Sequence, residues 1–266
     1  MQSTKGYPSD ISASRFERIS PFLQKASKRT RPTEVELLAV FNAILYVLKE
    51  GCRWRSLPHD FPNWNTVYYH FRKWKNHIDP ESKQPLLEVV LKKLISEDRR
   101  DDNREEETTM LIIDAQSVKN TDPAEQKGYD GGKKILGIKR HLAVDSRGLP
   151  HMLHVTTANI SDKAGAIEMI TARSDHFQRV EKVLVDGGYS GGPFAQFVRE
   201  KLAAETEVAK RSELHTFEVI PKRWVVERTI SWLEKCRRLW KNCERLLETS
   251  LSIIRLAFIS LLLRRS

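Results

Sequence analysis

Three acidic residues in the second half of the chain have a type and a setting suited to holding a divalent metal ion. Asp114 ends the apolar run LIID, Asp186 ends the apolar run VLVD, and Glu227 lies within RWVVERTISWL. A carboxylate at the end of a buried strand stands on a rigid element and can reach solvent. Carboxylate oxygens suit Mg²⁺, and two such ions about 4 Å apart can activate the attacking oxygen and stabilise the leaving oxygen of a phosphodiester. These residues therefore predict metal-dependent phosphoryl chemistry.

Each of these acids also has an ordinary structural explanation. An aspartate after a strand often only begins a turn, and that explanation suits Asp145 better than a functional one. Glu227 stands three residues after Trp224 and three before Ile230, on the helical face that we expect to point inward. A salt bridge to Arg223, four residues earlier, is the alternative role for this glutamate.

Other catalytic or metal-binding patterns have no counterpart in the sequence. It contains no GxxxxGK[ST] loop, no GxSxG elbow and no HExxH helix. Its three cysteines form no CxxC pair and no Cys/His cluster at zinc spacing, which argues against a disulfide framework and fits a reducing compartment. The histidines His141, His151 and His154 lie in strand patterns, where core or surface roles are favoured over metal ligation.

The residues around the acids predict an α/β domain. Short apolar or alternating runs predict strands near 110–114, 139–145, 150–157, 180–186 and 207–210. Helical patterns occupy 161–172, 193–202 and a long segment from about 222 to 245. The resulting order, βββαβαβα, implies a mixed β-sheet flanked by helices.

The first part of the chain predicts helices. Residues 33–50 form one helix that begins with a capping box of Thr33 and Glu36 and ends at Gly51; its apolar face comprises Leu37, Phe41, Ile44 and Leu48. A turn-rich link leads to a second helix over 65–76, so an all-α, helix-turn-helix-like domain is expected. Residues 97–107 are charged at ten of eleven positions and predict an exposed linker. The expected organisation is therefore a helical domain over 1–96, a linker over 97–107 and an α/β domain over 108–266.

The charge balance favours a polyanionic partner. The chain has 45 Lys and Arg against 35 Asp and Glu, a net charge of +10 and a pI near 9.5. A soluble basic protein without such a partner is the alternative. The polar N-terminus lacks a signal-peptide pattern, and the apolar stretch 251–263 is too short to span a membrane and contains Arg255. We expect a cytoplasmic protein whose terminal helix packs against its own core.

Four segments together resemble the successive motifs of bacterial insertion-sequence DDE transposases of the insertion-sequence-five group. They are LIIDAQSVKNT, GYDGGKKILGIKRHLAVDSRG, VLVDGGYSG and RWVVERTISWLEKCRRL, and the stretch LLAVFNAILYVLKEGCRWRSLPHDFPNWNTVYYHFRKW is similar to that family's N-terminal domain. The similarity covers nearly the whole chain. It implies an RNase H-like catalytic fold in which Asp114, Asp186 and Glu227 are the catalytic residues and the metal ligands.

The resemblance also implies a reaction. Two Mg²⁺ ions, or Mn²⁺ in their place, would assist direct attack at phosphorus. Water first frees a 3′ end at the terminal inverted repeat, and that 3′ hydroxyl then attacks target DNA without a covalent protein intermediate. The implied partners are double-stranded DNA, as transposon ends and as target, and a second copy of the chain on that DNA. The implied location is the bacterial cytoplasm, in association with the nucleoid.

A Tyr-Arg-Glu-Lys signature surrounds the glutamate in related transposases. Arg223 and Glu227 match it, whereas Ile220 occupies the tyrosine position and Glu234 the lysine position. Lys235 stands one residue later, and a phosphate contact is implied for Arg223.

Basic residues near these motifs are the candidate DNA contacts. In GYDGGKKILGIKRH the glycines let the backbone approach a phosphate closely, although a solvated hairpin with surface lysines is the alternative. In the N-terminal domain, basic residues alternate with aromatics, of which we expect Trp54 and Trp64 to be core. The complete candidate set is Arg53, Arg55, Arg72, Lys73, Lys119, Lys133, Lys134, Lys139, Arg140, His141, Arg223, Arg228 and Lys235.

Two other functions remain open at this point. A catalytically inactive DNA-binding derivative would act as a repressor, although all three acids are retained. An RNase H-like nuclease could use the same carboxylates for cleavage without joining.

Overall fold

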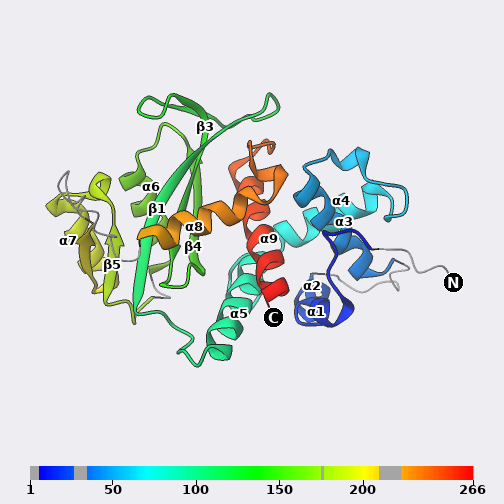
Figure 1. The fold of residues 1–266 in the computed structure, drawn as a ribbon, viewed down its shortest axis with the longest axis horizontal. Helices are drawn as coiled ribbons and strands as arrows, with labels where there is room; N and C mark the ends of the chain where they lie inside the picture. Colours follow the sequence, from blue (N-terminus) through cyan, green and yellow to red (C-terminus); the bar gives the residue numbers. More distant parts are fainter. Residues whose placement is uncertain (1–5, 27–34, 175–176, 210–222, 266) are drawn as a thin grey trace. The chain divides into compact units, whose positions relative to one another are not determined.

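We describe the protein from a computed structural model, in which the described residues are 6–26, 35–174, 177–209 and 223–265 (Figure 1). The chain forms two compact units. The first comprises Met1–Leu94, Lys235–Trp240 and Ser252–Ser266, and the second comprises Ile95–Glu234 and Lys241–Leu251. The expected boundary at residue 96 lies close to this division. The expected assignment of 108–266 to a single domain differs from it, because two C-terminal segments belong to the first unit.

The first unit is helical. It contains α1 (Ala13–Glu17), α2 (Ser20–Lys25), α3 (Leu37–Glu50), α4 (Trp64–Asn76), the first part of α5 (Leu86–Asp101), most of α9 (Leu247–Arg265) and the short 3-10 turns η1 (Trp54–Ser56) and η4 (Arg237–Leu239). Helix α3 ends as predicted at Gly51, whose φ of 71° is the left-handed conformation that glycine adopts freely. The helix begins after Glu36, whose side chain makes no capping bond, and Thr33 lies outside the described residues.

The terminal helix α9 packs into the first unit, as predicted. Its buried Arg255 donates a hydrogen bond from Nη2 to Oε2 of Glu88 at 2.6 Å, so the cation is neutralised inside an apolar helix. Within the described ranges, none of the helices is long and apolar enough to cross a membrane.

The second unit is built on a mixed sheet of β1 (Met110–Lys119), β2 (Gly128–Asp130), β3 (Ile135–Val144), β4 (Pro150–Thr157), β5 (Lys182–Val185) and β6 (Glu205–Val208). The strand order is β2-β3-β1-β5-β6, and β4 also pairs with β3. Strand β3 runs antiparallel to its neighbours, whereas β5 and β6 run parallel to β1. This confirms the predicted mixed sheet, to which the structure adds the short strand β2.

Helices cover both faces of this sheet. Helices α6 (Asp162–Thr171) and α7 (Gly192–Leu202) form one core with alternate residues of the central strands, including Leu111, Ile113 and Val183. Helix α8 (Arg223–Glu234) packs on β1 and β3 and crosses the sheet in Figure 1. The side chains that alternate with Leu111 and Ile113 therefore face α8.

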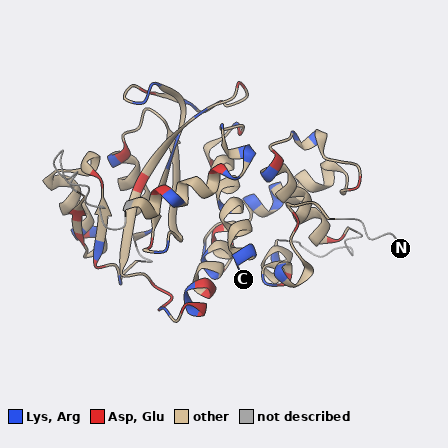
Figure 2. Ribbon diagram, in the orientation of Figure 1, with Lys and Arg blue, Asp and Glu red and all other residues tan. Residues whose placement is uncertain are grey.

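The predicted linker over 97–107 is wrong in its first half. Residues 97–101 continue α5, at the end of which Figure 2 shows acidic and basic residues side by side. Arg99 is buried, and it donates hydrogen bonds to the backbone oxygens of Glu105 at 2.7 Å and Glu107 at 2.9 Å. A charged run can thus be interior when a buried carboxylate and carbonyl oxygens satisfy its cation.

The predicted long helix over 222–245 is also shorter than expected. Helix α8 ends at Glu234, and a 3-10 turn follows at Arg237–Leu239. Residues 235–240 then belong to the first unit, and 241–251 to the second. The charged residues after Glu234 keep a helical spacing although the helix has ended, which is why the predicted helix is too long.

Candidate active site

Asp114 lies within β1, which continues to Lys119, so the expectation that it ends a strand is wrong. Asp186 directly follows the adjacent parallel strand β5. Ile112 of β1 pairs with Leu184 of β5, so Asp114 and Asp186 each stand two residues beyond a matched pair. Because side chains alternate along a strand, both carboxylates leave the same face, and neighbouring strands are about 4.8 Å apart. Sheet register therefore brings together two acids that are 72 positions apart, the difference between their numbers.

Backbone N–H groups orient both carboxylates. Asp114 Oδ1 accepts a hydrogen bond from the N–H of Ala115 at 2.7 Å. Asp186 caps the 3-10 turn η3 (Gly187–Tyr189), where its Oδ1 accepts from the N–H of Gly188 at 2.9 Å. Both side chains are half-buried, so they are held by the fold and remain accessible to a ligand.

A third carboxylate, Asp162 at the start of α6, belongs to the same neighbourhood. Burial, followed by the negative charges of Asp114, Asp162 and Asp186, raises the pKa of the Tyr189 hydroxyl far above its usual value. The Nζ of the buried Lys139 lies 2.7 Å from Oδ1 of Asp162 and neutralises it. Sequence reasoning missed Asp162, which after Ser161 looks only like the first residue of a capped helix.

Glu227 lies on α8, but not on its buried face. The expectation that it points inward is wrong, because Glu227 and Trp224 are exposed while Val225, Thr229 and Leu233 are buried. Across the described part of the chain, no three His, Cys, Asp or Glu side chains are grouped closely enough to hold a metal ion. The structure thus brings the two aspartates together and leaves the glutamate on the helix that covers their face of the sheet.

Two hydrogen bonds fix α8 on the turn between β3 and β4. Thr229 Oγ1 donates to the carbonyl oxygen of Gly148 at 2.9 Å, and Arg228 Nη2 donates to that of Arg147 at 2.9 Å. Gly148 has a φ of 81°, and a Cβ atom there would lie 2.4 Å from Thr229 Oγ1. This position therefore requires glycine for both its backbone and the approach of the helix.

The guanidinium of Arg228 is held between two tryptophans of the same helix. It lies 4.6 Å from the ring centroid of Trp224 and 5.1 Å from that of Trp232. Such cation–π contacts fix the side chain at the helix surface, directly beside Glu227 in the sequence.

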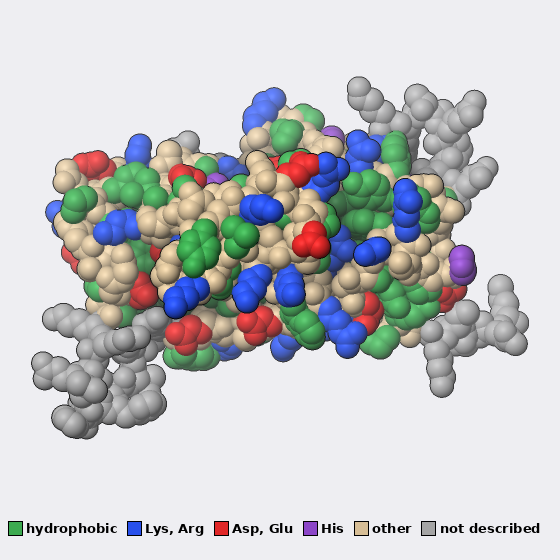
Figure 3. Space-filling view, turned by 90° about the horizontal axis from the view of Figure 1, so that it is seen from above, with side chains coloured by type: hydrophobic (Ala, Val, Ile, Leu, Met, Phe, Trp, Pro, Cys, Tyr) green, Lys and Arg blue, Asp and Glu red, His purple; other side chains and the backbone are tan. Residues whose placement is uncertain are grey.

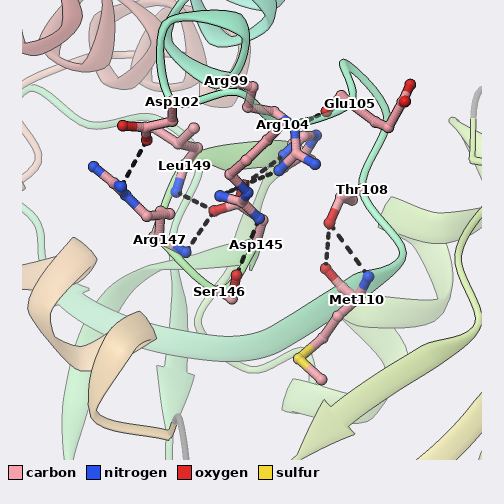
Figure 4. Close-up of polar contacts among 12 residues, drawn as sticks. Arg99, Asp102, Arg104, Glu105, Thr108, Met110, Asp145, Ser146, Arg147 and Leu149 are labelled. Atoms are coloured by element: carbon pink, nitrogen blue, oxygen red, sulfur yellow. Dashed lines mark hydrogen bonds and ion pairs between the residues drawn. The ribbon is translucent and has the colours of Figure 1, made fainter.

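A buried ionic cluster fixes the same turn from the other side (Figure 4). Asp145 Oδ1 accepts from the N–H groups of Arg147 at 2.8 Å and Leu149 at 3.0 Å. Its Oδ2 pairs with Arg99, and with Arg104 at 3.4 Å. Asp145 thus begins a turn, as its sequence context suggested, and it also joins α5 to the sheet.

Asp145 is ionised in the folded protein. Burial by itself raises the pKa of this carboxyl group, but the adjacent His151 ring and the N–H groups of Leu149 and Arg147 lower it by more, to well below its usual range. Burial lowers the pKa of His151. The carboxylate therefore remains available to the two arginines across the physiological pH range.

The candidate DNA contacts fall into two groups. Exposed or half-buried side chains that could meet DNA belong to Arg53, Arg55, Arg72, Lys73, Lys119, Lys133, Lys134, Arg228 and Lys235. Of these, Arg55 lies over the Trp64 ring at 5.1 Å and Lys73 over the Tyr69 ring at 5.5 Å. The side chain of Arg223 and all of Ile220 lie outside the described residues. Trp54 and Trp64, expected in the core, are half-buried.

The second group is interior. Lys139, Arg140 and His141 are 4%, 2% and 0% exposed. Lys139 pairs with Asp162, Arg140 donates to Gln116 Oε1 at 3.3 Å, and His141 Nε2 lies 2.9 Å from Thr156 Oγ1. Each is buried and has a partner within the protein, so we do not include these three residues in the proposed DNA-binding set.

Two family models and a curated relative match parts of this chain. The family model described as "Transposase DDE domain" matches residues 105–263, and the model described as "Putative transposase of IS4/5 family" matches residues 11–77. A protein of Burkholderia cepacia, "Putative transposase for insertion sequence element IS402", is 34% identical over 116 residues. That match covers 41% of this chain and 54% of the relative, so the chain spans about half of the relative's length.

A solved structure shows a weak likeness. It is the "CryoEM structure of simian T-cell lymphotropic virus intasome in complex with PP2A regulatory subunit B56 gamma", at a TM-score of 0.32 and 15% identity over 55% of this chain and 54% of that one. A DDE domain implies an RNase H-like fold, and the mixed sheet flanked by helices agrees with that. Because the DDE model matches more than half of the chain, the protein belongs to the family of transposases with a DDE domain.

Proposed function

We propose that this chain is a DNA transposase that binds the terminal inverted repeats of an insertion sequence, cleaves its ends and joins them to target DNA. Asp114, Asp186 and Glu227 are the catalytic residues of this proposal. The observation that supports it is the strand register: Ile112 pairs with Leu184, so Asp114 and Asp186 each stand two residues beyond a matched pair. These two carboxylates offer the hard oxygen donors that Mg²⁺ or Mn²⁺ prefers.

The roles of the three acids follow from their positions. Asp114 and Asp186 are oriented by backbone N–H groups and would hold the metal between them. Glu227 would join them from α8, which the turn at Gly148 holds on that face of the sheet. When bound, a pair of divalent ions supplies Lewis-acid activation of the attacking oxygen and stabilises the leaving oxygen. No protein nucleophile is required, because water and then the freed 3′ hydroxyl attack phosphorus.

The exposed cations would bind the DNA backbone. The net charge of +10 favours a polyanion, and Figure 3 shows Lys and Arg interspersed with hydrophobic side chains on the face that it presents. Joining requires two transposon ends, so we further propose that two copies of the chain assemble on DNA. A DNA substrate of this kind would place the protein in the bacterial cytoplasm, at the nucleoid.

A plasmid-nicking assay tests the catalytic proposal. We expect the wild-type chain to nick supercoiled plasmid with Mg²⁺ and to lose that activity when EDTA is added. Asp114→Asn and Asp186→Asn should each lower the rate by more than about a hundredfold, because even residues that only support a metal ligand cost 10–100-fold. DNA affinity measured in EDTA should stay within about twofold of wild type, since neither change removes a phosphate contact.

A matched control separates site chemistry from loss of surface charge. Asp122 is an exposed acid of the same unit, and Asp122→Asn should nick like wild type. Full activity in either site variant would refute the assignment. Nicking without transfer of a cleaved end into target DNA would identify a nuclease instead.

A further inference from the structure

The ribbon formed by β2 and the start of β3 exposes an apolar pair that the catalytic proposal does not use. Tyr129 and Leu136 are direct partners in this ribbon, so their side chains lie on the same side of it. They are 56% and 52% exposed, so the pair presents apolar surface to solvent.

The ribbon is held rigidly by one aspartate at its turn. Asp130 Oδ1 accepts from the N–H groups of Gly132 at 3.1 Å and Lys133 at 3.0 Å. Its Oδ2 accepts from Ser117 Oγ at 2.6 Å and lies 3.4 Å from the Nζ of Lys139. The carboxylate of Asp130 is therefore directed into the protein, because internal donors occupy its oxygens.

The same turn reaches the strand that carries Asp114. Lys133 Nζ donates to the backbone oxygen of Ala115 at 3.4 Å and lies 3.7 Å from Oδ2 of Asp162. The neighbouring Gly137 approaches β1 so closely that a Cβ atom would lie 1.9 Å from the carbonyl oxygen of Val118. DNA bound at Asp114 would accordingly come close to this ribbon.

The chemistry of the ribbon surface matches duplex DNA. Lys127, Lys133 and Lys134 are exposed on either side of the apolar pair, while Asp130 is neutralised. Lysines flanking an apolar centre suit a groove, where phosphates border base edges and thymine methyl groups. The major groove is wide enough to admit a two-stranded β-ribbon.

We propose that the β2–β3 ribbon enters the major groove of the bound DNA, with Tyr129 and Leu136 against base edges and Lys133 and Lys134 on the flanking phosphates. This inference rests on the proposed function for its ligand, and it adds a groove contact to the phosphate contacts of that function.

Salt-dependent affinity distinguishes the two kinds of contact. The probe is a fluorescein-labelled random-sequence duplex, titrated in EDTA so that no cleavage occurs. Tyr129→Ser with Leu136→Ser should weaken binding by roughly tenfold, the size of one good groove contact, and leave the slope of log affinity against log salt unchanged. Lys133→Gln with Lys134→Gln should instead reduce that slope by about 0.9 for each phosphate that is no longer neutralised.

Controls separate the groove contact from a failure to fold. Ile78 is an apolar residue of the other unit and is 51% exposed, against 52% for Leu136. The Ile78→Ser variant should bind DNA like wild type. Leu136→Met keeps the apolar area and should retain affinity, whereas the double Ser variant should bind more weakly with an unchanged thermal midpoint. Wild-type affinity in the double Ser variant would overturn the inference. A change in its sedimentation without DNA, at unchanged DNA affinity, would overturn it in favour of contact with a second copy.

The groove itself is tested with alternating dA-dT and dA-dU duplexes, which differ only in the thymine methyl group. Wild type should prefer dA-dT, and the double Ser variant should bind both equally. Equal binding by wild type would reject the major groove. All these binding measurements omit metal, so they test the ribbon contact independently of cleavage. A chain that binds DNA through the ribbon but never nicks plasmid would refute only the catalytic proposal.

Discussion

His141 is buried in a neutral form beside Thr156, and this gives the protein a specific dependence on pH. Burial, helped by the charge of His154, lowers the pKa of His141 to about 3, whereas an unfolded histidine has a pKa near 6.5. The unfolded chain therefore takes up a proton below about pH 6.5 that the folded chain refuses until about pH 3. The contribution of His141 to the free energy of unfolding is therefore complete above the pKa of the unfolded chain, about 6.5. It declines as pH falls from that value toward the folded pKa of about 3.

We accordingly expect His141→Gln to flatten the pH dependence of stability. Glutamine retains a hydrogen-bonding group for Thr156 but does not titrate. As pH is lowered between the two pKa values, the free energy of unfolding should decrease more steeply for wild type than for the variant. The difference in slope should be up to about 1.4 kcal/mol per pH unit. Urea unfolding over a series of pH values measures both curves, and parallel curves would contradict the assignment.

Asp145 makes stability depend on a buried ion pair. Its carboxylate is fully buried and pairs with Arg99, which is itself 3% exposed. Asp145→Asn should lower the free energy of unfolding by about 3 kcal/mol or more, because the guanidinium is left buried without its counter-ion. The double variant with Arg99→Met should recover part of this loss in a double-mutant cycle measured in urea. Independent, additive effects would show that the pair is not coupled.

The interior position of Lys139 could not be predicted from its sequence neighbours. A lysine in GIKRH looks like a surface cation. In the fold its Nζ is internal because Asp162, Asp130 and the backbone oxygen of Ile160 are all within reach. Arg140 and His141 are buried too, and each forms a hydrogen bond with an interior side chain, Gln116 and Thr156 respectively. Asp186 follows the end of β5, as its apolar run indicated, whereas Asp114 lies within β1, because the polar residues after it continue the strand to Lys119.

At the scale of elements, the β3–β4 turn positions the helix that carries Glu227. Gly148→Ala should strain a left-handed residue and push its new Cβ against Thr229, which lies 2.4 Å from that point. We expect a stability loss of about 1–3 kcal/mol, with a larger proportional loss of nicking than of DNA affinity. Thr229→Val should act in the same direction, because it removes the bond to the carbonyl oxygen of Gly148.

Ser231 provides the matched control for this prediction. Its hydroxyl donates only within α8, to the carbonyl oxygen of Arg228 at 2.7 Å, and it is exposed. Ser231→Ala should therefore leave both stability and nicking unchanged. If Thr229→Val and Ser231→Ala behaved alike, the turn would not be what positions α8.

Periodicity predicted elements well where one face alternates or one stripe is apolar. Strand β4 matched its expected range of 150–157, and α4 matched to within one residue. The charges of residues 97–101 predicted a linker where the last turns of α5 lie, although Arg99 within them is buried. Val225 and Val226 are buried and define the inward face of α8, whereas the predicted inward face included Trp224, which is exposed. The prediction failed because an apolar pattern does not distinguish an exposed tryptophan from a buried valine.

At the scale of the whole molecule, the chain passes repeatedly between its two units, so neither is a continuous stretch of sequence. Composition indicated a polyanionic partner, and the strand pattern indicated a mixed sheet. Neither indicated that residues 235–240 and 252–266 belong with the N-terminal helices, because that assignment depends on contacts such as Arg255 with Glu88 across 167 positions. The family resemblance, and not the spacing of residues, connected the three acids to transposition.

Assembly of two copies on DNA would make joining depend on the fraction of active chains. Wild type is mixed with Asp114→Asn chains in varying proportions. If a separate copy cuts each end and both must be active, the rate of double-end joining should be proportional to the square of the wild-type fraction. If one copy serves both ends, joining should fall in direct proportion. The variant changes a carboxylate and no phosphate contact, so it should enter assemblies as readily as wild type. Sedimentation on an end duplex supplies the stoichiometry, and a linear dose response with one copy per duplex would refute assembly of two copies.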